Sequence, residues 1–126
     1  MSGMFEVYVK THFSAAHRLL GYPGDCARVH GHNWMVEVYV KSGELNEIGI
    51  AIDFRDIRKA VKEVVATMDH SDLNDLPAFS HLNPSSENIA RHLYLELARI
   101  LNSRSVRVSK VKVCETPGAG AFYWEE

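Results

Sequence analysis

The stretch HGHNWMVEVYVK, residues 30–41, alternates between two kinds of side chain with a period of two. Such alternation predicts a β-strand with one buried face, because successive side chains of a strand point to opposite sides of the sheet. The stretch FEVYVKTHFSAAH, residues 5–17, shows the same period and predicts a second strand. Turn residues at 21–25 (GYPGD) lie between the two, so we expect them to pair through a loop.

Two amphipathic helices are expected in the middle of the chain. Apolar residues recur at helical spacing over residues 57–68, and Asp53 before them is a suitable N-cap. A second helical stripe covers residues 89–101. The segment NPSSE, residues 83–87, has the composition of a helix start, which places Pro84 in the first turn.

Two further strands are expected after the helices. They cover residues 106–115, with an irregularity at Ser109-Lys110, and residues 121–124. A glycine-rich turn over residues 116–120 joins them. The order ββααββ predicts an α+β fold, a four-stranded antiparallel sheet with two helices on one face.

Length and composition narrow the classes of protein. The chain has 126 residues, 46% of them hydrophobic, which predicts a single domain over residues 1–126. A net charge of −2 argues against nucleic acid as a partner. No window approaches the roughly 18 consecutive apolar residues of a membrane span, and no secretory signal is recognisable. Two cysteines, Cys26 and Cys114, make no disulfide framework, so we expect a cytoplasmic protein with reduced thiols.

Seven histidines make the composition unusual. His30 and His32 share the face of the second strand that carries Trp34, and buried imidazoles need polar partners. They are either a hydrogen-bonded core pair or two ligands of a metal ion. Four further histidines could supply a third nitrogen: His12, His17, His70 and His81. His17 is favoured, because it lies on the buried face of the first strand. Zinc is the default metal for three imidazoles, and iron, cobalt and nickel remain open.

Two other features carry reactive groups. Cys26 lies in the first loop beside Arg28, where a thiolate is favoured and can act as a base or nucleophile. Its alternative role is that of a small buried residue. Asp69-His70 follows the first helix, and such a pair either orients an imidazole for proton transfer or simply ends the helix.

Glu115 is expected on the buried face of its strand, with Val111 and Val113. A carboxylate there needs several donors or a charged partner. It is either a structural ion-pair partner or a receptor for the N–H-rich edge of a pterin or guanine, which offers two parallel donors. Cys114 beside it is expected to be a buried apolar residue.

Five motifs resemble the 6-pyruvoyl-tetrahydropterin synthase family. They are FSAAHRL (13–19), CARVHGHN (26–33), MDH (68–70), PSSEN (84–88) and CET (114–116). The resemblance implies the tunnelling fold (T-fold), in which trimers join their sheets into a barrel and two trimers stack as a homohexamer. It also implies a role for each site residue: zinc ligands His17, His30 and His32, catalytic Cys26, Asp69 and His70, and the pterin anchor Glu115.

The spacing of the cysteine points to one branch of this family. Cys26 stands four residues before His30, as C-x-x-x-H-G-H, which is similar to the branch that serves queuosine and other 7-deazapurines. That resemblance implies a lyase that converts 7,8-dihydroneopterin triphosphate to 6-carboxy-5,6,7,8-tetrahydropterin, acetaldehyde and triphosphate. The alternatives are a pyruvoyl-forming synthase, which eliminates triphosphate, and a non-catalytic protein that binds zinc or pterin.

Overall fold

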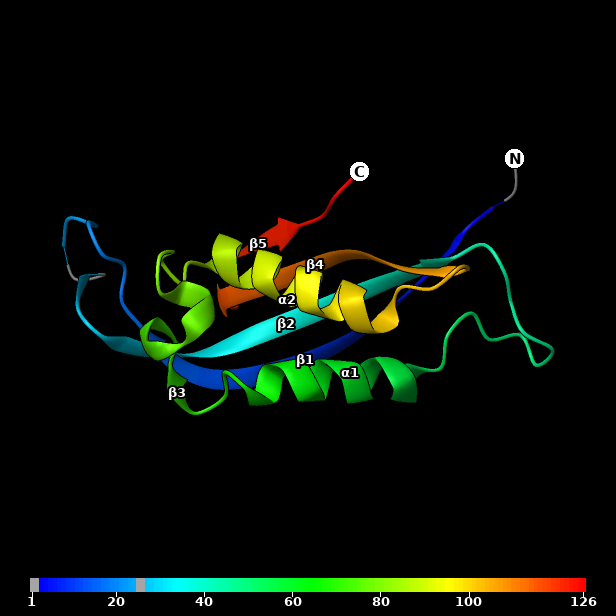
Figure 1. Cartoon of the computed structure of the whole chain (residues 1–126), viewed down its shortest axis with the longest axis horizontal. Coiled ribbons are helices and arrows are strands. Elements are labelled where there is room, and N and C mark those ends of the chain that lie inside the picture. Colours follow the sequence, from blue (N-terminus) through cyan, green and yellow to red (C-terminus); the bar gives the residue numbers. More distant parts are fainter. Residues whose placement is uncertain (1–2, 25–26) are drawn as a thin grey trace.

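The computed structural model describes residues 3–24 and 27–126, which form one sheet covered by two helices (Figure 1). The strands are β1 (Phe5–His17), β2 (His30–Ser42), β3 (Ser71–Asp72), β4 (Val106–Thr116) and β5 (Ala119–Tyr123). The helices are α1 (Phe54–Ala66) and α2 (Ser86–Leu101), with short 3₁₀ turns η2 (Leu73–Asp75) and η3 (Pro77–Phe79) between them. None of the described helices has the length and apolar character needed to cross a membrane.

The sheet has the strand order β3-β1-β2-β4-β5. The four predicted strands pair as antiparallel neighbours, and β1 and β2 have the bounds that the alternating pattern indicates, to within one residue. Strand β3 was not predicted. It pairs parallel to β1 over only two residues, Ala15 with Ser71 and Ala16 with Asp72, which is too short to show a period.

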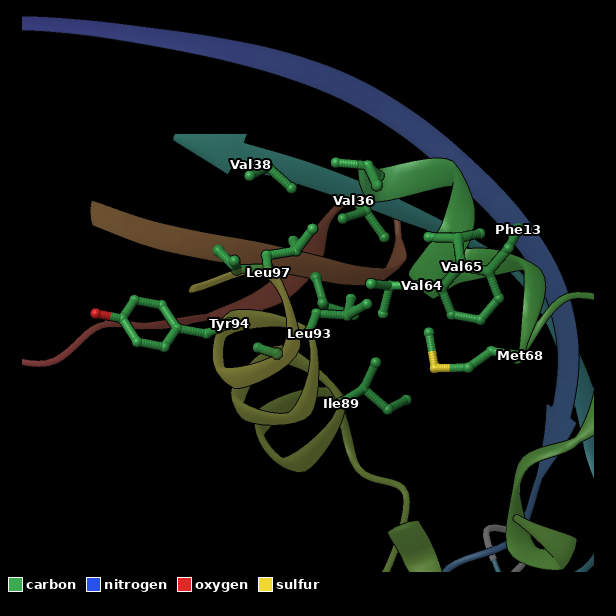
Figure 2. Close-up of a cluster of buried hydrophobic side chains, with 14 of the residues drawn as sticks. Phe13, Val36, Val38, Val64, Val65, Met68, Ile89, Leu93, Tyr94 and Leu97 are labelled. Carbon is green, nitrogen blue, oxygen red and sulfur yellow. The ribbon is translucent and has the colours of Figure 1, made fainter. Parts of the chain in front are cut away.

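The core lies between one face of the sheet and both helices. Figure 2 shows Phe13 and Val36 from the strands meeting Val64 from α1 and Leu93 from α2. Met68, just beyond α1, is fully buried in the same cluster. The predicted apolar stripes therefore both face the sheet, as the amphipathic pattern indicates.

The helix starts agree with the sequence signals except at one proline. Asp53 caps α1, since its carboxylate accepts a hydrogen bond from the Arg55 backbone at 2.8 Å. Ser85 caps α2 by accepting from the Asn88 backbone at 3.2 Å. Pro84 therefore precedes the cap, and its prediction in the first turn is wrong. Ser85 takes the N-cap position because its hydroxyl can accept a hydrogen bond from a free backbone N–H of the first turn, whereas proline has no side-chain acceptor.

Strand β4 carries two β-bulges. The register steps from Tyr39–Lys110 to Val40–Val108, so Ser109 is an extra residue, which confirms the predicted irregularity. A second step, between Cys114 and Thr116, makes Glu115 an extra residue opposite β5. The turn that follows is only Pro117-Gly118, shorter than predicted, and β5 begins and ends earlier than expected. Because the turn is short, β5 begins at Ala119, two residues before the start that the glycine-rich stretch predicted.

Candidate metal centre

Three histidines meet on the helix-covered face of the sheet, at the end of β1. His17 pairs with His30 across the β1–β2 ladder, and His32 pairs with Ala15. The ring centroid of His17 lies 4.5 Å from that of His30 and 5.3 Å from that of His32. The structure thus brings together the three histidines that the sequence singled out. His12 and His81 are exposed elsewhere and do not join them.

Glu115 reaches the same point from β4. Its Oε1 atom lies 3.0 Å from Nε2 of His17, 2.9 Å from Nε2 of His32 and 3.9 Å from Nε2 of His30. Ligand atoms of these four residues all lie within 4.8 Å of one another. The expected buried-face position of Glu115 is therefore observed, and the β-bulge at this residue re-aims its side chain, as bulges beside active sites do.

Backbone carbonyls fix the tautomers of two of the rings. Nδ1 of His17 lies 2.7 Å from the carbonyl oxygen of Pro84, and Nδ1 of His30 lies 2.7 Å from that of Arg28. A carbonyl oxygen only accepts, so each Nδ1 carries the proton and donates. In the neutral rings, Nε2 is then left with a lone pair directed at the cluster. Carbonyl partners of this kind are the usual outer support of metal-binding histidines.

His32 completes the case for a cation. Its Nε2 atom is buried and has no hydrogen-bond partner among the described residues, although Glu115 Oε1 is close. Burial is the largest influence on this ring and lowers its pKa, which favours the neutral form. With Nδ1 protonated in His17 and His30, the Nε2 lone pairs of both neutral rings face the Glu115 carboxylate, and these acceptors repel one another unless a positive charge lies among them. Three imidazoles and a carboxylate suit a divalent metal such as zinc.

Trp34 forms the floor of the cluster. Its ring centroid is 4.8 Å from that of His17, and its indole nitrogen donates to the Ala15 carbonyl at 3.2 Å. The side chain of His17 is only 1% exposed, whereas that of Glu115 is 34% exposed. The group of side chains that could hold a metal ion is therefore closed on the core side and open on the side of the carboxylate.

Two asparagines bind the backbone that follows His17, and no local sequence pattern predicts this role for them. The side chain of Asn74 accepts from the Arg18 backbone N–H at 2.8 Å and donates to its carbonyl at 3.1 Å. Asn83 makes the same pair of bonds with Leu20, both at 2.9 Å. Each side-chain amide bonds both the N–H and the carbonyl of one residue, as a neighbouring strand would. The two asparagines therefore hold the backbone of residues 18–20 in place after β1 ends.

Asp69 and His70 lie at the free edge of β1, beside Ser14. Asp69 accepts from the Ser14 backbone N–H at 2.9 Å, and His70 donates its own N–H to the Ser14 carbonyl. The Ser14 bond is the first of several influences that lower the pKa of the Asp69 carboxyl. His70 has a φ of 57°, in the left-handed region that side chains rarely adopt. Strain of this kind is often found at functional residues.

The Asp69-His70 pair contacts β1 at Ser14, three residues before His17. Nδ1 of His70 lies 3.0 Å from Oδ1 of Asp69, and the His70 side chain is 82% exposed. His70 and His32 line one surface recess of about 360 Å³. Most of the other residues that line it, among them Ser14, Gly31 and Asn33, lie on the face of the sheet opposite the cluster, so the catalytic role of Asp69 and His70 stays a prediction. Cys26, the third residue predicted to transfer protons, lies outside the described residues.

Cys114 is a buried free thiol, only 6% exposed, as predicted for a small apolar residue. It faces away from the histidine cluster, toward Gly120 of β5, with which it pairs. A metal or catalytic role for this thiol is therefore not supported by its position.

Known proteins resemble this chain over nearly its whole length. A family model described as 6-pyruvoyl tetrahydropterin synthase matches residues 6–126. A protein of Archaeoglobus fulgidus named "Putative 6-carboxy-5,6,7,8-tetrahydropterin synthase" is 45% identical over 103 residues, covering 81% of this chain and 84% of that protein. The 6-carboxy-5,6,7,8-tetrahydropterin synthase of Synechocystis is 32% identical over 126 residues, covering 96% and 94%.

A solved structure shows the same fold. The 6-pyruvoyl tetrahydropterin synthase of Caenorhabditis elegans superposes with a TM-score of 0.88 at 27% identity, covering 99% of this chain and 98% of the other. The predicted T-fold architecture of strands and helices is thereby confirmed for the single chain.

Proposed function

The chain belongs to the 6-pyruvoyl tetrahydropterin synthase family, and on this premise we propose that it is a 6-carboxy-5,6,7,8-tetrahydropterin synthase. The enzyme is a lyase that acts on 7,8-dihydroneopterin triphosphate and releases acetaldehyde and triphosphate, in the pathway to queuosine. The observation that carries the proposal is the convergence of His17, His30, His32 and Glu115 on one point. The choice of 6-carboxy-tetrahydropterin as the product rests on the names of the similar proteins.

The metal is proposed to be zinc, held by His17, His30 and His32. This donor set leaves a position open for a further ligand, as in catalytic zinc sites. Bound zinc supplies Lewis acidity, which lowers the pKa of hydroxyl groups on the substrate side chain. The chain itself contributes the fixed ring orientations, through the Pro84 and Arg28 carbonyls.

Glu115 is proposed to anchor the pterin ring. A carboxylate can accept two parallel N–H bonds from the amino and amide groups of that ring. Its partial exposure leaves it accessible to a ligand, unlike the buried His17.

Proton transfer is proposed for Cys26, Asp69 and His70. Asp69 faces Nδ1 of His70 at 3.0 Å and can orient the imidazole as an acid or base. Cys26 stands four residues before His30 in the sequence, and a thiolate near cations is a usable base. Neither a nicotinamide nor a flavin is required, because the reduction of the ring is internal to the substrate.

A homohexamer is proposed as the working particle. The edge of β1 over residues 5–14 has no partner strand among the described residues, and β5 is the other edge of the sheet. Open edges of this kind need protection, and joining the sheets of several copies into a barrel provides it. Sedimentation at micromolar concentration should give a mass well above that of the 14.2 kDa chain. We also propose a cytoplasmic location, where the free thiol of Cys114 stays reduced.

Product analysis tests the proposed reaction. The metal-loaded protein is incubated with 7,8-dihydroneopterin triphosphate, and acetaldehyde and the pterin product are separated and quantified. Equal amounts of acetaldehyde and 6-carboxy-tetrahydropterin support the proposal. A pyruvoyl pterin without acetaldehyde would favour the alternative synthase, for which the similarity to the Caenorhabditis elegans enzyme speaks. Binding without turnover would favour a non-catalytic pterin protein.

A further inference from the structure

We propose that Glu115 is a fourth protein ligand of the metal while no pterin is bound, and that it is the ligand that is exchanged. Its Oε1 atom lies within 3.0 Å of Nε2 of both His17 and His32. Distances of this size are close to those between neighbouring ligand atoms around a tetrahedral zinc ion, whose bonds are about 2.0–2.1 Å. Oε1 therefore occupies the place of a fourth ligand rather than that of a distant anchor.

The backbone around Glu115 is built to aim the carboxylate there. Glu115 is the extra residue of a β-bulge between Cys114 and Thr116. Gly120, the partner of Cys114, lets β5 approach closely: a Cβ atom there would lie 2.6 Å from Cys114 Sγ and 2.7 Å from the Val113 carbonyl oxygen. The bulge is thus locked by a contact that only glycine permits, and the direction of the Glu115 side chain follows from it.

Hydrogen bonding does not explain the approach of Oε1 to all of the rings, since it accounts for the His17 contact alone. The Nδ1–H groups of His17 and His30 are already given to backbone carbonyls, which leaves the lone pairs of Nε2 facing the carboxylate. A proton on His17 Nε2 would satisfy one contact, but His32 Nε2 would still lie 2.9 Å from the same oxygen without a hydrogen bond. A metal ion among the four atoms satisfies all of them at once.

Glu115 has the most exposed side chain of the four. It is 34% exposed, against 29% for His30, 21% for His32 and 1% for His17, so the carboxylate is accessible to an arriving molecule. This second part rests on the proposed function: when the N–H groups of a pterin bind the carboxylate, Oε1 leaves the metal. One position of the metal then opens at the moment the substrate is present. Until then, the carboxylate keeps small anions away from the metal.

Cobalt substitution tests the ligand directly. The wild-type protein, Glu115→Gln, Glu115→Ala and the control Glu37→Gln are loaded with Co²⁺, and visible spectra are recorded during titration with azide. Glu37 is a suitable control because it lies on the opposite face of the sheet. We expect azide to perturb the spectra of both Glu115 variants and to leave the wild type and Glu37→Gln unchanged. We also expect the Co²⁺ affinity of the Glu115 variants to fall at least about tenfold, since even losing an outer-shell partner costs 10–100-fold.

Two results would overturn the proposal. One is azide binding to the wild type as readily as to Glu115→Gln. The other is an unchanged Co²⁺ spectrum and affinity in both Glu115 variants. Addition of neopterin, a pterin without phosphates, tests the exchange: the wild-type spectrum should move toward that of Glu115→Gln and become sensitive to azide. A neopterin-saturated wild type that still excludes azide would contradict it. The azide experiment without pterin is independent of turnover, so failure of the proposed reaction would leave the ligand assignment standing.

Discussion

His17 on β1 lies directly opposite His30 on β2, and their imidazole centroids are 4.5 Å apart. The register of a single strand pair therefore sets the spacing of two of the rings that could hold a metal ion. A slip of one residue would turn every side chain of one strand to the other face of the sheet. Packing of Phe13 and Trp34 on the buried face, with ring centroids 6.1 Å apart, holds that register four residue pairs further along. Core packing and metal binding thus depend on the same alignment.

Replacement of His17 by alanine should remove most of the metal. The variant loses one of the three nitrogens and leaves the Pro84 carbonyl without its donor. An unpaired buried carbonyl costs about 1–3 kcal/mol, so urea unfolding should also show a lower stability. Metal content is measured by atomic emission on the purified protein. His12→Ala, an exposed histidine of the same strand, should keep both its metal and its stability. Full metal retention in His17→Ala would mean that another residue is the third ligand.

Replacement of Cys26 by alanine should abolish most of the turnover without affecting the metal. The proposed ligands are untouched, and loss of a general acid or base lowers the rate by about 10²–10⁴. Steady-state rates and metal content are measured on the same preparations. Cys114→Ala is the matched control, because that thiol is buried away from the cluster. A Cys26→Ala enzyme at full speed would assign the proton transfers to Asp69 and His70.

Replacement of Gly120 by alanine should destabilise the protein and disturb the Glu115 bulge. The added Cβ would lie 2.6 Å from Cys114 Sγ and 2.7 Å from the Val113 carbonyl oxygen, so β5 must move away. Overpacking of this kind costs about 1–3 kcal/mol, measured by urea unfolding. Gly118→Ala is the control, since a Cβ there meets nothing within 4 Å. Equal stability of the two variants would show that β5 yields without strain.

The phenol of Tyr39 should titrate unusually late. Its hydrogen bond to Glu37 is the largest of the effects that raise the pKa of Tyr39 to about 12, from the ordinary value of 10.0. Because the folded pKa is the higher one, the stabilisation is complete below pH 10 and is lost as the pH rises to about 12. Ultraviolet difference titration of the wild type against Tyr39→Phe isolates this phenol. In Glu37→Gln its midpoint should fall back toward 10, and an unmoved midpoint would assign the shift to burial.

The long elements were predictable because each has a regular pattern. The alternation in residues 5–17 and 30–41 is strong enough to give the bounds of β1 and β2 to within one residue, and the shared face placed His17 with His30 and His32. Two short features that lack a repeating sequence pattern, β3 and the bulge at Glu115, were not predicted. Strand β3 has two residues, and the bulge at Glu115 depends on how closely β5 approaches at Gly120.

Contacts between distant segments were the other limit. The Asn74 and Asn83 bonds to Arg18 and Leu20 span 56 and 63 residues, and nothing local to an asparagine marks it as a partner for a remote backbone. The distance of Glu115 from the imidazoles belongs to the same class. The alternation along β4 predicts that Glu115 lies on the buried face of the sheet. Only the folded sheet shows that its carboxylate contacts His17 and His32.

The three imidazoles belong to one pair of strands, β1 and β2, whereas the carboxylate comes from a strand 98 residues beyond His17. During synthesis the ribosome releases the three imidazoles before β4, so under the proposed ligand assignment a nascent chain would hold a metal ion with three ligands only. The proposed fourth ligand would join when β4 and β5 dock. The ligand field of the metal would then report whether a newly made chain has finished folding.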